Sequence, residues 1–177
     1  TRPGGAHRLD AAMSHSDSPS LAGAVRRAAT QLADAGVPDP DVDAELLAAH
    51  VLGFSRGALQ AGMIRGDEVS AADAEQFAAL IARRARREPL QHITGLAPFR
   101  NLELRVGTGV FVPRPETEIV AQLAIDALRA TASPSPIAVD LGTGSGAMAL
   151  AMATEVPHAQ VFAAENSVDA FVWAKEN

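Results

Sequence analysis

Apolar residues recur with helical spacing along the first half of the chain. Residues 20–35 form one such stripe and Gly36 follows it directly, which predicts a helix ended by a left-handed glycine. A second stripe over residues 40–52 begins at a proline and ends before Gly53, as helices often do. The stripe positions are Leu21, Val25, Ala28, Leu32 and Ala35 in the first helix, and Val42, Leu46, Ala49 and Leu52 in the second.

A third helix is predicted after a short irregular stretch. Ser70 and Asp73 have the spacing of a capping box, and Pro89 ends the segment. The expected buried residues are Phe77, Leu80 and Ile81, and the last turns carry Arg83, Arg84, Arg86 and Arg87. These four arginines are either a docking patch for an acidic or RNA-bound partner, or cations placed favourably at a helix C-terminus. The second interpretation is favoured.

The pattern changes to period two at Leu102. Residues 102–106 alternate between apolar and charged side chains, and glycines at 107 and 109 precede another apolar run, which predicts a β-hairpin turning at residues 107–109. Further elements are expected as a helix over 116–129 with a stripe at Ile119, Leu123 and Leu128, a short buried strand at 137–141, a helix at 146–155, a strand at 160–164 and a helix from Val168 onward. The fold class is therefore α/β, preceded by a small helical bundle.

Composition narrows the function classes. The chain has 177 residues, 47% hydrophobic and 20% charged, so a packed core is possible, and its net charge of -6 argues against a surface that is wholly a nucleic-acid footprint. It has no cysteine, and its five histidines lack ligand spacing, so no metal site is expected. Residues 1–19 have no apolar core and are expected to be a mobile tail rather than a signal peptide. No apolar run reaches the roughly 18 residues of a membrane span, and a cytoplasmic location is expected.

A glycine-rich segment carries the chemistry. Residues 140–146 read Asp-Leu-Gly-Thr-Gly-Ser-Gly between a predicted strand and a predicted helix, where backbone N–H groups can face a ligand. Glu165 ends the next strand, and a carboxylate there can accept both hydroxyl protons of a ribose. Gly142, Gly144 and Ala147 also satisfy a relaxed dinucleotide pattern. Asp140, two positions before the first glycine, fits a cationic S-adenosylmethionine better.

Several motifs together resemble a known family. Residues 88–95 read Glu-Pro-Leu-Gln-His-Ile-Thr-Gly, and residues 111–118 read Phe-Val-Pro-Arg-Pro-Glu-Thr-Glu. With Phe99 between them, and with residues 140–146 and 165–167 after them, this order resembles the bacterial peptide chain release factor glutamine methyltransferases.

The resemblance covers about residues 20–177 and implies a domain organisation. After the mobile tail expected at 1–19, it implies a helical domain at 20–88 that recognises the release factor, a hairpin linker at 89–117 and part of a Rossmann-like, S-adenosylmethionine-dependent methyltransferase domain at 118–177. The methyl group would go to the side-chain amide of the glutamine in a Gly-Gly-Gln loop of peptide chain release factors. The family's Asn-Pro-Pro-Tyr loop, which aligns that amide, is absent from this sequence, so the chain resembles a truncated member and no catalytic residue is identified.

The resemblance also assigns site residues. It implies that the cofactor contacts Asp140, Gly142, Thr143, Gly144, Ser145, Gly146, Glu165 and Phe99. It implies that Arg114, Pro115, Glu116 and Thr117 position the substrate. For Phe99 and Arg114 a purely structural role in packing or ion pairing stays open, as does a role for Asp140 in capping the loop.

Other functions stay open beside this one. A DNA adenine or other amino-group methyltransferase shares the cofactor loop, although a basic groove is not evident at a net charge of -6. A truncated chain could also be a non-catalytic module that binds release factors. An NAD-dependent oxidoreductase is the most distant alternative. Direct nucleic-acid and membrane contacts are not expected, and the sequence does not indicate an oligomeric state.

Overall fold

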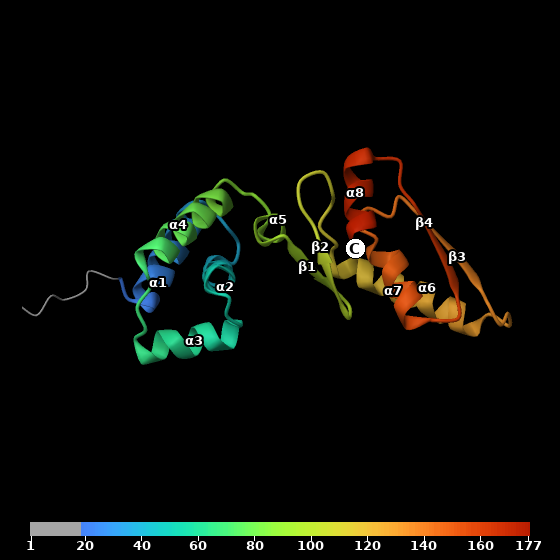
Figure 1. Cartoon of the computed structure of the whole chain (residues 1–177), viewed down its shortest axis with the longest axis horizontal. Helices are drawn as coiled ribbons and strands as arrows, with labels where there is room; N and C mark the ends of the chain where they lie inside the picture. The colour runs from blue at the N-terminus through green and yellow to red at the C-terminus, as the bar shows by residue number, and fades with distance from the viewer. Residues whose placement is uncertain (1–18) are drawn as a thin grey trace, which may run out of the picture.

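The computed structural model describes residues 19–177, so the tail expected at 1–19 lies almost wholly outside the described residues. The chain is elongated: helices alone form one end, helices with a pair of strands form the other, and a short hairpin lies between them (Figure 1). This is a helical domain followed by a partial Rossmann-like fold, as the sequence predicted. Within residues 19–177, none of the helices has both the length and the apolar character that a membrane span requires.

Four helices form the first end of the molecule. They are α1 (Leu21–Asp34), α2 (Pro40–Leu52), α3 (Arg56–Arg65) and α4 (Ala71–Ala85). Serine side chains cap three of them: Ser20, Ser55 and Ser70 accept hydrogen bonds from the backbone N–H groups of Gly23, Ala58 and Asp73. Fully buried Leu32, Leu47, Leu59 and Ile81 share one hydrophobic core, and each stabilises the bundle by about 1.5–3 kcal/mol through burial.

Two details of this bundle differ from the sequence expectations. Helix α3 occupies a stretch that was expected to be irregular, because its apolar pattern is weak. The sequence signals for this helix are the Ser55 cap at its start and Gly66 at its end, whose φ is +81°. In α2 the buried face includes Leu47 and Ala48, whereas the expected Val42 and Leu46 are only half-buried.

The arginines at the end of α4 make contacts within the bundle. Arg83 forms a bidentate pair with Glu88, with N–O distances of 2.9 and 2.5 Å. Arg84 donates to Asp43 of α2 at 2.6 Å, and Arg87 donates to the carbonyl oxygen of Gly36. Three of the four arginines are thus engaged within the helical domain, and Arg83 and Arg84 are in the last turn of α4, where the favoured interpretation placed them.

A short helix and a hairpin follow the bundle. Helix α5 (Leu90–Thr94) leads into β1 (Leu96–Phe99), which pairs antiparallel with β2 (Leu102–Arg105). The two-residue hairpin turn is therefore at Arg100 and Asn101. The chain also turns at residues 108–109, but no strand follows that turn before α6, so the hairpin expected there was wrong. Pro98 within β1 hides that strand in the sequence, since proline is uncommon in strands.

The glycines of the expected turn serve a different purpose. A Cβ at Gly107 would lie 2.5 Å from Cζ2 of Trp173, and one at Gly109 would lie 2.8 Å from Cβ of Asp169. Both neighbours belong to the last helix, α8 (Val168–Glu176). Glycine is thus required here because the chain passes close to α8. At Gly109 a turn is a second reason, since its φ is +94° and the Val110 N–H donates to the Gly107 carbonyl oxygen at 3.3 Å.

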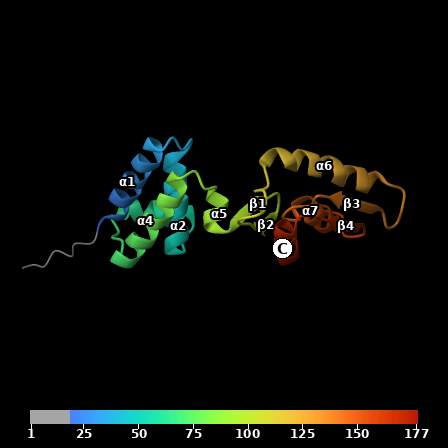
Figure 2. The same ribbon diagram turned by 90° about the horizontal axis from the view of Figure 1, so that it is seen from above.

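The second end of the molecule is built on two parallel strands. Strand β3 (Ile137–Leu141) pairs with β4 (Gln160–Ala164), and α7 (Ala147–Glu155) connects them. Helix α6 (Pro115–Ala130) runs alongside α7 (Figure 2). Their contact is one apolar cluster with the hairpin, and its members include Phe99, Leu104, Ala121, Ile125, Ala151 and Val156.

Burial in this part differs from the sequence expectations. Strand β3 was expected to be buried, yet Ile137, Val139 and Leu141 are 65%, 58% and 78% exposed. In α6, the expected stripe residues Ile119 and Leu123 are 67% and 65% exposed, and of that stripe only Leu128 is buried, together with Ala121 and Ile125. A sheet of two strands has one face without a covering layer, so an apolar strand is not buried on both sides.

Candidate functional site

The glycine loop between β3 and α7 has the conformation that its sequence predicted. Gly142, Gly144 and Gly146 have φ values of +74°, +59° and +85°, a region that other residues enter only with strain. The N–H groups of Gly142 and Thr143 both donate to the carbonyl oxygen of Ala164, at 2.8 and 3.1 Å. The loop is therefore fixed to the end of β4.

One hydrogen bond fixes the acid that precedes the loop. Asp140 is half-buried, and its Oδ2 accepts a hydrogen bond of 2.6 Å from the Thr143 hydroxyl. Thr143 itself is buried. One carboxylate oxygen is thus held by the loop, which is the capping role left open for Asp140, while the side chain still borders the cleft described below. The two roles are compatible.

Glu165 is oriented by backbone donors. Its Oε1 accepts from the N–H groups of Asn166 and Ser167, both at 2.9 Å, and its Oε2 accepts from Gly144 at 2.8 Å. The bonds from Ser167 and Gly144 are the main reason that the pKa of Glu165 lies below its ordinary value. The carboxylate is ionised at neutral pH. Because Oε1 already accepts two bonds, the lone pair that stays available for a further donor is on Oε2.

A cleft of about 390 Å³ opens beside the glycine loop, within the size range of small-molecule sites. One wall is the loop and the first turn of α7, and the other is the extended segment leading into α6. The lining residues are Phe111, Val112, Pro113, Arg114, Thr117, Asp140, Gly142, Thr143, Gly144, Ser145, Ala147 and Met148. Segments far apart in the sequence, residues 111–117 and 140–148, are thus brought together.

Most of the predicted site residues border this cleft. Arg114, Thr117, Asp140, Gly142, Thr143, Gly144 and Ser145 line it. Pro115 and Glu116, on the first turn of α6, do not line it. Neither do Gly146, which is the N-cap of α7, and Glu165, which accepts a bond from the loop's Gly144 N–H. The predicted residues therefore fall into a lining group and an adjoining group.

Phe99 lies elsewhere. Its side chain is 1% exposed and packs in the cluster that contains Ile125 and Val156. As the last residue of β1, opposite Leu102, it points into the contact of the hairpin with α6 and α7. The structure therefore supports the packing role left open for Phe99 and does not bring it to the cleft.

Some lining residues were not predicted as site residues. Phe111 is 90% exposed at the cleft, and Val112 and Pro113 continue its wall. All three belong to the motif that carries the family resemblance, which could have indicated them. Met148 follows the glycine loop on α7, where helical geometry could have placed it.

Asn177 joins the glycine loop to the hairpin. Its Nδ2 donates to the carbonyl oxygens of Ser145 at 2.9 Å and Arg105 at 3.0 Å, and its Oδ1 accepts from the Arg105 N–H at 2.7 Å. Val110, a few residues after the hairpin, also lies near the loop: its Cγ2 is 3.8 Å from the position that a Cβ on Gly144 would take. Sequence analysis missed this role because an amide 72 residues beyond its partner gives no local signal.

Metal ligands are the next feature to consider at the site. Within residues 19–177, no group of three histidine or acidic side chains is arranged to hold a metal ion. The polar groups at the site are backbone N–H groups of the loop, the carboxylates of Asp140 and Glu165 and the polar side chains of the cleft.

Comparison with known proteins confirms the resemblance. Residues 23–95 match the family described as PrmC N-terminal domain. A release factor glutamine methyltransferase of Streptomyces coelicolor is 54% identical over 86% of this chain and 52% of its own length. Proteins of the same name from Bifidobacterium longum and Deinococcus radiodurans are 44% and 42% identical over 86% and 85% of this chain, and 52% and 53% of their own. The chain thus spans about half the length of the curated relatives it matches.

Proposed function

We propose, from its relationship to the release factor glutamine methyltransferases, that this chain is part of an S-adenosylmethionine-dependent methyltransferase. The proposed substrate is the side-chain amide of the glutamine in the Gly-Gly-Gln motif of peptide chain release factors. The observation that carries the proposal is the cleft, because it joins the glycine loop to residues 111–117. These are two of the segments on which the family resemblance depends.

Each part of the chain has a role in this proposal. Residues 20–88 would recognise the release factor, residues 89–117 would link the two parts, and residues 118–177 would contribute the cofactor half of the methyltransferase domain. Translation termination takes place in the cytoplasm, so the protein would act there. The proposal involves no direct contact with nucleic acid or membrane.

The cleft residues suit S-adenosylmethionine chemically. A Cβ at Gly142 would meet no atom within 4 Å, which leaves the loop backbone open to a ligand. The Asp140 carboxylate borders this space and would attract the sulfonium and amino groups, whose charge is positive. Glu165 would accept the ribose hydroxyls, and residues 142–146 would hold the methionine part. When bound, the cofactor supplies an electrophilic methyl group.

The remaining task of the protein is alignment. An amide nitrogen is a weak nucleophile because its lone pair is delocalised, so the rate depends on placing it in line with the methyl group. Arg114 and Thr117 line the wall opposite the loop, and we assign to them and to the adjoining Pro115 and Glu116 the positioning of the glutamine. The Asn-Pro-Pro-Tyr loop that takes up the amide protons in the family is absent from this sequence, so no catalytic residue is assigned.

The proposal favours release factors over the other substrates considered. The relatives are named for release factor glutamine methylation, and a net charge of -6 does not favour a nucleic-acid substrate. A non-catalytic module would bind release factor without the cofactor, which a titration with S-adenosylmethionine distinguishes.

A labelling experiment tests the proposal. The full protein that contains this chain is incubated with methyl-labelled S-adenosylmethionine and a release factor, and peptide mass mapping locates the label. One methyl group on the glutamine of the Gly-Gly-Gln motif is the expected result. A release factor with alanine in place of that glutamine is the control and should stay unlabelled. Label on adenine in a duplex DNA, with none on the release factor, would contradict the proposal.

A further inference from the structure

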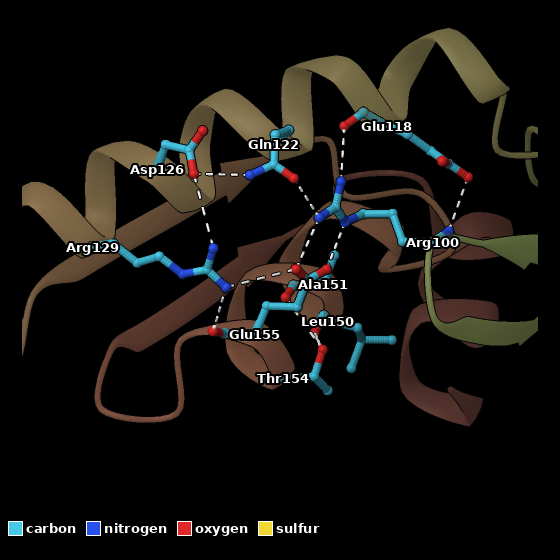
Figure 3. Close-up of polar contacts among 9 residues, drawn as sticks. All are labelled: Arg100, Glu118, Gln122, Asp126, Arg129, Leu150, Ala151, Thr154 and Glu155. Carbon is cyan, nitrogen blue, oxygen red and sulfur yellow. Dashed lines mark hydrogen bonds and ion pairs between the residues drawn. The ribbon is translucent and has the colours of Figure 1, made fainter.

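A cluster of polar side chains joins the hairpin turn to α6 and α7, outside the cleft (Figure 3). Arg100 is at its centre. The Nε and Nη2 atoms of Arg100 donate to the two carboxylate oxygens of Glu155 at 2.6 and 2.8 Å. Nη2 also donates to Oε1 of Gln122 at 2.7 Å, and Nη1 donates to the carbonyl oxygen of Glu118 at 3.3 Å. One guanidinium group thereby connects two helices.

The backbone of Arg100 takes part as well. Its N–H donates to Oε1 of Glu118 at 2.9 Å, and its φ is +53°. Two-residue hairpin turns need this left-handed conformation and usually have glycine, asparagine or aspartate there. Arginine at this position bears backbone strain, which the contacts of its side chain and N–H offset.

The ion pair at the centre of the cluster is shielded from solvent. The Arg100 and Glu155 side chains are 14% and 16% exposed, so salt screens their pairing less than it screens a surface pair. The bidentate bond from Arg100 is the main cause of the lowered pKa of Glu155. Arg129, Glu118 and Asp126 are the other charged groups that face it.

The two helices that Arg100 connects are the ones whose first turns line the cleft. Arg114 and Thr117 are at the start of α6, and Ala147 and Met148 are at the start of α7. Arg100 binds α6 one residue beyond Thr117 and binds α7 at its last residue. A change in its contacts would therefore shift one wall of the cleft relative to the other.

We propose that Arg100 is a positioning residue for the cleft, which holds the Arg114–Thr117 wall at the distance from the glycine loop that ligand binding requires. Arg100 does not line the cleft and acts through α6 and α7. The consequence for catalysis rests on the proposed function, whereas the consequence for the α6 backbone does not.

The test replaces Arg100 with glycine in the full protein. Gly fits a φ of +53° without strain, so R100G removes the guanidinium contacts while it favours the same turn. Arg87 offers a matched control, since it is the other non-glycine residue with positive φ in residues 19–177, at +69°, and its side chain bonds Gly36 within the helical bundle. Both variants are compared by circular dichroism, hydrogen exchange and S-adenosylmethionine titration with turnover.

For R100G we expect faster hydrogen exchange over residues 114–122. We also expect kcat/KM to fall by about 10- to 100-fold with a raised KM for S-adenosylmethionine, since a misplacement of about 1 Å can cost up to about 100-fold. R87G should change neither the exchange of residues 114–122 nor the affinity for S-adenosylmethionine titrated without release factor. Exchange and kinetics like wild type in a folded R100G would overturn the inference. If R100G does not fold, R100K takes its place in the same measurements with the same expected changes, because lysine keeps the charge but not the bidentate geometry. If wild type neither binds nor transfers, the proposed function fails, and hydrogen exchange still decides the role of Arg100.

Discussion

At the scale of single residues, the site depends on side chains that hold backbone groups. Glu165 accepts three backbone N–H bonds, and Asn177 uses its amide to join the Ser145 carbonyl to both backbone groups of Arg105. Both residues border the glycine loop without being part of it. The loop is therefore prepared for a ligand by contacts that need not change on binding.

Replacing Asn177 with aspartate tests this preparation. N177D keeps the shape of the side chain but removes the Nδ2 donor and faces the Ser145 carbonyl with a negative oxygen. We expect S-adenosylmethionine to bind about tenfold more weakly, as measured by calorimetry. This is about the effect of losing one hydrogen bond. The control N166D adds the same charge at an exposed asparagine beside the loop, and equal weakening by both variants would contradict the prediction.

Glu165 predicts a pH dependence. Its pKa is lowered in the folded state, so its contribution to stability is complete above the ordinary carboxyl pKa of about 4.3 and is lost as the pH falls through the folded value. E165Q should therefore show a smaller drop in melting temperature than wild type when the pH is lowered from neutral to about 3. Parallel melting curves for the two proteins over this range would count against the role given to Glu165.

At the scale of elements, short polar signals determine where helices begin. Ser20, Ser55, Ser70 and Ser167 each cap a helix through a bond to a backbone N–H group. Such caps are local, so Ser70 could be predicted from the sequence together with the helix that it starts. The position of the hairpin turn could not be predicted in this way. Pro98 makes β1 look unlike a strand, and the glycines at 107 and 109 are needed where the chain passes close to α8.

Removing one cap should destabilise the bundle measurably. S70A loses the bond from the Asp73 N–H, which is 3.1 Å long. We expect the free energy of unfolding, measured by urea titration, to fall by about 1 kcal/mol. T30A serves as the control, since Thr30 is exposed within α1 and bonds only to the carbonyl of Arg26. A loss in S70A no larger than in T30A would show that the cap contributes little.

At the scale of the whole molecule, the chain has separate apolar cores. Ile81 belongs to the core of the helical bundle, and Ile125 belongs to the cluster of the hairpin, α6 and α7. Helix α5 and the hairpin lie between the two ends (Figure 1). Each end buries its own apolar surface, so each can open without the other.

Truncating one side chain in each core tests this independence. I81A and I125A should each destabilise by about 2–5 kcal/mol, because both side chains are fully buried. Hydrogen exchange should show the loss of protection in residues 20–88 for I81A and in residues 96–177 for I125A. Loss throughout the chain in both variants would mean that the two ends unfold as one unit.

The sequence by itself determined most helices, both parallel strands, the glycine loop with Asp140 and Glu165, and the family resemblance, because these depend on local spacing, capping and left-handed glycines. Only the tertiary structure decided where the hairpin turns, that Phe99 packs in the core, and that β3 is exposed. It also decided that Arg100 and Asn177 fix the surroundings of the cleft, 55 and 72 residues from partners that they contact. Such contacts leave no periodic pattern, because they arise only when the packing of separate elements brings single side chains together.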